Sequence, residues 1–152
     1  MFFRGSFSST YGQTIDEGNT RNALNWFEVH TPDFDRAVTF YETILGCSMR
    51  RMEVPGAHEP IRMALFPIEG DGVGGALVYL PEHTPATAGP LLYLNANPDL
   101  NVVLSRVEQA GGTIIMTKTE LPDNFGFMAI FIDCEGNHMA LHSINPAVLP
   151  SL

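Results

Sequence analysis

An internal repeat constrains the fold of this chain more than any other feature of its sequence. The stretch TPDFD begins at Thr31 and NPDLN begins at Asn97. The glycines expected to end the following helices, Gly46 and Gly112, have the same separation of 66 positions. Near the ends of the two halves, GALV and MALH correspond with a separation of 64 positions. Matching helix starts, helix ends and last strands predict two copies of one supersecondary unit.

Each copy begins with a short strand-like run followed by an amphipathic helix. Apolar residues recur at the three- and four-residue spacing of one helix face, which predicts helices near residues 33–45 and 99–111. Thr31 or Asp33 is suited to the N-cap of the first helix. The apolar positions are Ala37, Phe40, Tyr41, Ile44 and Leu45 in the first helix, and Leu100, Val103, Leu104, Val107 and Ala110 in the second.

Short apolar or alternating runs bounded by Gly and Pro predict the strands. We therefore predict an α+β fold of two βαβββ modules, over residues 23–82 and 88–145, which together form one domain over residues 23–152. Residues 1–22 are rich in Gly, Ser, Thr and Asn without periodicity, so we expect a flexible N-terminal arm or leader. The strand-like runs are 22–30, 47–54, 61–68, 74–80, 89–96, 113–117, 126–132 and 137–143.

Charge and hydropathy argue against two classes of partner. The chain of 152 residues has a net charge of −9 and no basic cluster, so we expect no binding to nucleic acid. No apolar run approaches the roughly 18 residues needed to cross a bilayer, so we expect no membrane partner. Cys47 and Cys134 lie far apart without CxxC spacing, which favours two free thiols of a cytoplasmic protein.

Two stretches, WFEVHTPDFDRAVTFYETILG and DCEGNHMALHS, together resemble the vicinal oxygen chelate superfamily. That superfamily includes glyoxalase I, bleomycin- and fosfomycin-resistance proteins and extradiol dioxygenases, and the strings are similar to a glyoxalase-related branch of unassigned function. The resemblance covers roughly residues 23–145. It implies a curved mixed sheet around a cup, with helices on the outer face, a small organic ligand inside, and pairing of two copies into a homodimer.

The metalloenzymes of this superfamily hold a divalent ion with four cup ligands, usually His, Gln or Glu. Carried over to this sequence, the ligand positions fall on residues that bind no metal, so we predict no metal and no cofactor. A displaced site stays open as an alternative, but residues four apart on one strand are separated by about 13 Å and cannot share an ion. The family positions are Trp26, Ala76, Leu91 or Leu92, and Ala140; the displaced candidates are Glu28, His30, His138 and His142.

Strand alternation predicts which side chains face the implied cup. Glu28 and His142 are the catalytic candidates, as a general base and a proton shuttle. The sequence leaves two functions open: a metal-independent lyase- or isomerase-like enzyme related to lactoylglutathione lyase, or a non-catalytic sequestering protein of the antibiotic-resistance type. The predicted ligand-binding residues are Trp26, His30, Tyr93, Asn95, Phe131 and His138.

Overall fold

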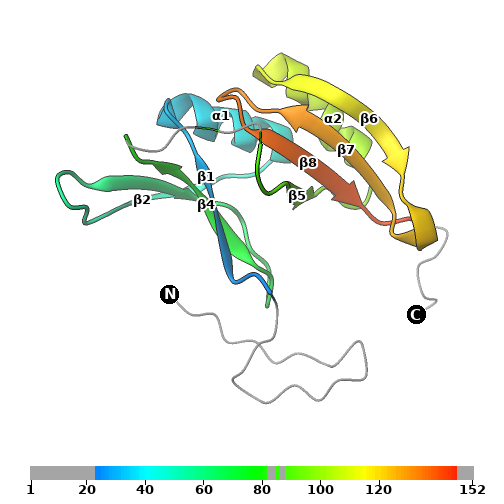
Figure 1. The fold of residues 1–152 in the computed structure, drawn as a ribbon, viewed down its shortest axis with the longest axis horizontal. Helices are drawn as coiled ribbons and strands as arrows, with labels where there is room; N and C mark the ends of the chain where they lie inside the picture. The colour runs from blue at the N-terminus through cyan, green and yellow to red at the C-terminus, as the bar shows by residue number, and fades with distance from the viewer. Residues whose placement is uncertain (1–22, 82–84, 86–87, 147–152) are drawn as a thin grey trace, which may run out of the picture.

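The computed structural model describes residues 23–81, 85 and 88–146, so the predicted arm at residues 1–22 lies outside the described part. The described chain forms two modules of the same element order (Figure 1). The first contains β1 (Trp26–His30), α1 (Phe34–Leu45), β2 (Arg50–Val54), β3 (Ile61–Leu65) and β4 (Gly74–Tyr79). The second contains β5 (Leu92–Asn95), α2 (Leu100–Ala110), β6 (Thr113–Glu120), the short 3-10 helix η1 (Pro122–Asn124), β7 (Phe127–Ile132) and β8 (His138–Ser143).

Each module contains its own four-stranded mixed sheet. The strand orders are β1-β4-β3-β2 and β5-β8-β7-β6. The β1–β4 and β5–β8 pairs are parallel, and the other pairs are antiparallel. The pairing also repeats, because Glu28 is opposite Ala76 in the first sheet and Tyr93 is opposite Ala140 in the second. The predicted α+β fold of two βαβββ modules is confirmed.

The helix boundaries follow from capping residues. The Asp33 side chain accepts a hydrogen bond of 3.1 Å from the Arg36 backbone N–H, and Asp99 accepts one of 3.0 Å from Asn101. α1 ends at Gly46, whose φ of 62° suits a residue without Cβ. α2 ends at Gly111, with φ of 109°, so the prediction of Gly112 as the terminating glycine is wrong by one residue.

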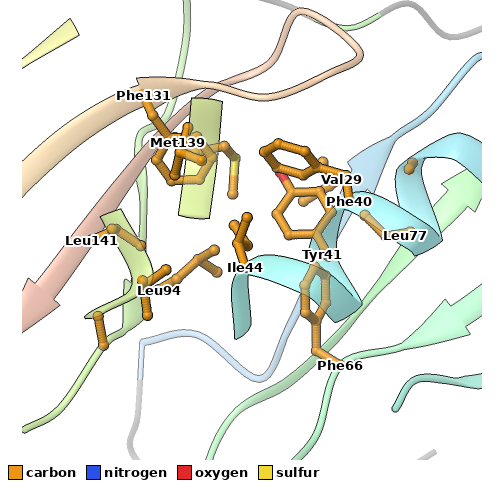
Figure 2. Close-up of a cluster of buried hydrophobic side chains, with 14 of the residues drawn as sticks. Val29, Phe40, Tyr41, Ile44, Phe66, Leu77, Leu94, Phe131, Met139 and Leu141 are labelled. Carbon is orange, nitrogen blue, oxygen red and sulfur yellow. The ribbon is translucent and has the colours of Figure 1, made fainter. Parts of the chain in front are cut away.

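The two modules share one hydrophobic core, and the helices lie within it. On α1, Tyr41 packs edge-on against Phe66 of the first module at 5.4 Å between ring centroids, and Phe40 lies 6.2 Å from Phe131 of the second. Figure 2 shows the α1 side chains between the buried residues of the two modules. Each sheet thus turns one face toward the shared core. We call the opposite face of each sheet its cup face.

The turn between β7 and β8, residues 133–137, joins the second module to the start of α1; we call it the inter-module turn. The carboxylate of Glu135 is fully buried and accepts hydrogen bonds of 2.6 Å from the Asp33 backbone N–H and from the guanidinium of Arg36. Because a buried carboxylate needs such partners to offset its lost hydration, these contacts hold the turn against the helix N-terminus.

A second buried carboxylate completes this junction. Asp133 accepts a hydrogen bond of 2.6 Å from the hydroxyl of Tyr41, and Asn137 donates one of 2.9 Å to the carbonyl of His30 at the end of β1. Burial, with the neighbouring Asp133 charge, raises the pKa of Tyr41 well above its usual value, so Tyr41 remains a donor. The relative placement of the modules therefore depends on polar contacts as well as on the core.

Candidate functional site

The cup face of the first module combines an aromatic and an acidic side chain with an apolar surface. Val29 is buried in the core, so its neighbours on β1, Trp26, Glu28 and His30, lie on the cup face as strand alternation predicts. The indole Nε1 of Trp26 donates a hydrogen bond of 3.2 Å to Glu28. The partly buried apolar side chains of this face are Met52, Val54, Ile61, Met63 and Leu65.

The cup face of the second module is mainly apolar with a few neutral polar groups. Leu94, Met139 and Leu141 are in the core, so the alternating residues of β5 and β8 lie on the cup face. Tyr93 is 51% exposed there. The residues of this face are Tyr93 and Asn95 on β5, Met128, Ile130 and Ile132 on β7, and His138, Ala140 and His142 on β8.

Phe131 does not lie on the cup face, and its predicted position there is wrong. It is fully buried, pairs with Met139 across β7 and β8, and packs against Phe40 of α1. The pairing register of β7 places Ile130 and Ile132 on the cup face instead. A register displaced by one residue exchanges the two faces of a strand, and this decided the position of Phe131.

His142 and Asn95 are both oriented by backbone groups. The Nε2 atom of His142 lies 2.6 Å from the carbonyl oxygen of Phe125, and Asn95 Oδ1 accepts a hydrogen bond of 3.0 Å from the Asn97 N–H. Gly126 permits the first contact, because a Cβ there would overlap a backbone carbonyl and approach the imidazole. No side-chain motif predicts the contact with the Phe125 carbonyl, and Gly126 is the single local signal for it in the sequence.

The cup faces provide no cluster of metal ligands in the described residues. No group of three or more His, Cys, Asp or Glu side chains is close enough to hold an ion in residues 23–81, 85 and 88–146. The family ligand positions carry Trp26, Ala76 and Ala140. At the fifth strand the register selects Leu91, since Leu92 packs against the core. The donor set therefore does not fit the metal centre of the metalloenzymes.

The predicted catalytic pair is likewise not assembled. Glu28 lies on β1 and His142 on β8, which belong to different sheets, and no hydrogen bond or ion pair between them is found in the described residues. Both cup faces lie on the outer sides of sheets whose inner sides meet at the shared core. One chain thus presents two separate half-cups.

A cleft of about 910 Å³ opens between the modules beside β5, and residues from both faces of that strand line it, Tyr93 and Asn95 of the cup face among them. Its lining includes Phe27, Leu45 and Phe66 from the first module and Leu94 and Val103 from the second. Four large apolar side chains that also line it are exposed, namely Leu24 (48%), Ile68 (37%), Val73 (38%) and Tyr93 (51%). Sequence periodicity did not predict this surface, because most of these residues lie at strand ends or in loops.

The repeated element order and the two matching sheets, each with one half-cup, place this chain in the class of proteins built from tandem βαβββ modules. A family model described as Glyoxalase/Bleomycin resistance protein/Dioxygenase superfamily matches residues 23–141, and the chain belongs to this superfamily. The resemblance seen in the sequence is thereby confirmed. No curated protein matches the chain. None of the described helices is long and apolar enough to cross a membrane.

Several solved structures share the fold at low sequence identity. An antibiotic binding protein from Streptomyces sp. CB03234, TnmS3, is 23% identical, with a TM-score of 0.57 over 82% of this chain and 97% of its own. A glyoxylase/bleomycin resistance protein/dioxygenase domain from Frankia sp. EAN1pec is 18% identical, with a TM-score of 0.60 over 84% and 95%. A glyoxalase I mutant from Zea mays is 19% identical, with a TM-score of 0.55 over 78% of this chain and 44% of its own.

Proposed function

We propose that two copies of this chain associate and sequester a small organic molecule without metal. In this proposal each binding cup combines the first-module cup face of one copy with the second-module cup face of the other. The observation that carries it is the outward direction of both half-cups from the shared core. Each half-cup has an apolar surface with few polar groups, which is typical of small-molecule sites once enclosed.

The inter-module cleft supports the association of two copies. Exposed apolar patches of this kind mark interaction surfaces, and Leu24, Ile68, Val73 and Tyr93 gather around one opening. β1 and β5 border it and each pairs on one side only within the described sheets, so each leaves a free edge. A second copy would cover both features.

Binding is favoured over catalysis because the acid–base candidates are not assembled. Glu28 accepts from Trp26, while the Nε2 of His142 contacts a backbone carbonyl. The structural likeness to TnmS3 also supports a binding function, since that protein is described as antibiotic binding. The proposed compartment is the cytoplasm, where thiols remain reduced, because Cys47 and Cys134 are both free.

An enzyme is the second candidate, and one observation favours it. With Nε2 held at the Phe125 carbonyl, the other ring nitrogen of His142 is the one left to exchange protons with a ligand. This enzyme would be a metal-independent relative of lactoylglutathione lyase. Turnover of the methylglyoxal–glutathione hemithioacetal in the presence of EDTA, lost in His142→Phe, would establish it over sequestration.

Light scattering at micromolar concentration tests the assembly. We expect the mass of a dimer for the wild type and of a monomer for Ile68→Asp, because this substitution charges the cleft. Ile115→Asp is the matched control: Ile115 is 55% exposed on β6, away from the cleft, and its variant should remain dimeric. A monomeric wild type contradicts the proposal.

Subunit mixing tests whether each cup is shared. Trp26→Asp and Ala140→Asp place a charge in the first-module and second-module half-cups, respectively. Each homodimer should fail to bind a ligand identified by thermal shift. A co-expressed heterodimer should regain one site per dimer, because one of its cups carries neither change. No recovery in a folded heterodimer would refute the shared cup.

A further inference from the structure

Two polar residues of the second-module half-cup are direct neighbours. Asn95 on β5 and His142 on β8 are register partners in a parallel ladder, and both lie on the cup face. Adjacent strands are about 4.8 Å apart, so a single functional group of a ligand spans the two side chains.

The contact with Phe125 fixes the proton position on His142. A backbone carbonyl only accepts hydrogen bonds, so the Nε2 atom at 2.6 Å must carry the proton. In the neutral imidazole the other nitrogen, Nδ1, then carries the lone pair and accepts. The assignment depends on the backbone partner and not on the appearance of the ring.

The contact with Asn97 fixes the amide of Asn95 in the same way. A backbone N–H only donates, so the atom that it meets at 3.0 Å is the oxygen of the Asn95 amide. The NH₂ group points elsewhere and offers two donors. Neither this group nor His142 Nδ1 makes a hydrogen bond within the part of the chain that the structure describes.

The geometry points to a donor–acceptor pair, Asn95 Nδ2 and His142 Nδ1, that recognises a lactam or primary carboxamide on an otherwise apolar ligand. The ligand carbonyl accepts from Asn95 and its N–H donates to His142. This inference rests on the proposed function and names the ligand class of that cup. The pair is already oriented, so binding needs little reorganisation.

Charged ligands fit this half-cup poorly. A carboxylate would set a lone pair against His142 Nδ1 and would gain no cation from this module. Of its two basic residues, Arg106 donates to the Ile44 carbonyl and Lys118 pairs with Asp99. The surrounding cup-face side chains, Met128 and Ile130 among them, are apolar and favour the uncharged remainder of such a ligand.

Three bicyclic probes of similar shape test the pair: isoquinolone, a lactam; isocoumarin, the matched lactone; and naphthalene. Calorimetry on the full chain should show isoquinolone binding about tenfold more tightly than isocoumarin, because the ring oxygen replaces the N–H donor and faces the lone pair of His142. His142→Phe should reduce the ratio to near one. Asn95→Asp should weaken both carbonyl probes and leave naphthalene unchanged.

Asn101→Asp, at an exposed position on α2, is the control and should alter none of the three affinities. A role of Asn95 and His142 in structure alone would lower all affinities together and leave the lactam-to-lactone ratio intact, which would overturn the inference. Equal wild-type affinities for the three probes would also overturn it while leaving the cup in place. If no probe binds at millimolar concentration, both the inference and the proposed function fail.

Discussion

Glu135→Gln tests whether the inter-module turn stabilises the junction of the two modules. The substitution keeps the shape of the side chain and removes its charge. Glu135 accepts three contacts of 2.6 Å, from the Asp33 N–H, Arg36 Nε and Arg36 Nη2. Gln has one acceptor oxygen in place of two, so at least one of these N–H donors faces an NH₂ group, which cannot accept a hydrogen bond.

The magnitude follows from the burial of the two partners. Breaking a fully buried pair costs about 3–5 kcal/mol, because the remaining charge is left without water. Here the side chain of Arg36 is 57% exposed and rehydrates, whereas that of Glu135 has 0% exposure. We therefore expect the loss of charge-assisted hydrogen bonds, about 1.5–3 kcal/mol. For a chain of this size that corresponds to a fall in Tm of roughly 3–12 °C.

Urea denaturation and calorimetry measure the effect. Asp35→Asn is the matched control, since Asp35 pairs with Arg51 and Arg62 at the surface, where water screens the charges; its Tm should hardly change. A double-mutant cycle that combines Glu135→Gln with Arg36→Met should give a coupling free energy that shows a stabilising interaction between the two wild-type side chains. A loss below about 0.5 kcal/mol, within the range of ordinary surface substitutions, would refute the reasoning.

Three further outcomes are expected. Gly75→Ala should destabilise the fold by about 1–3 kcal/mol in urea titration, because a Cβ there overlaps the ring of Phe27, whereas Gly74→Ala, with more room, should cost less; equal effects would contradict this. Burial, with the nearby carboxylates, raises the pKa of Cys134 to about 12. Its alkylation by iodoacetamide at pH 8 should therefore be far slower than that of glutathione and should recover in urea, as followed by mass spectrometry. Elemental analysis should find less than a stoichiometric amount of Zn, Ni, Mn or Fe; one equivalent per chain would restore a metal site.

Local sequence patterns determined the elements and part of the candidate site. Apolar spacing placed both helices, because the helix period is fixed by backbone geometry and a buried stripe repeats with it. Strand alternation placed Trp26 and Glu28 on one face of β1 and His142 on the matching face of β8, since adjacent side chains of a strand point to opposite faces.

Only the tertiary structure decided how those elements were assembled. Phe131 turned toward the core because the register of β7 against β8 depends on pairing, which alternation within one strand does not fix. Glu28 and His142 are separated because they lie on two different sheets, each of which contributes its other face to the shared core. The backbone carbonyl of Phe125 oriented His142 through a contact that no side-chain motif encodes, since every residue type carries the same carbonyl.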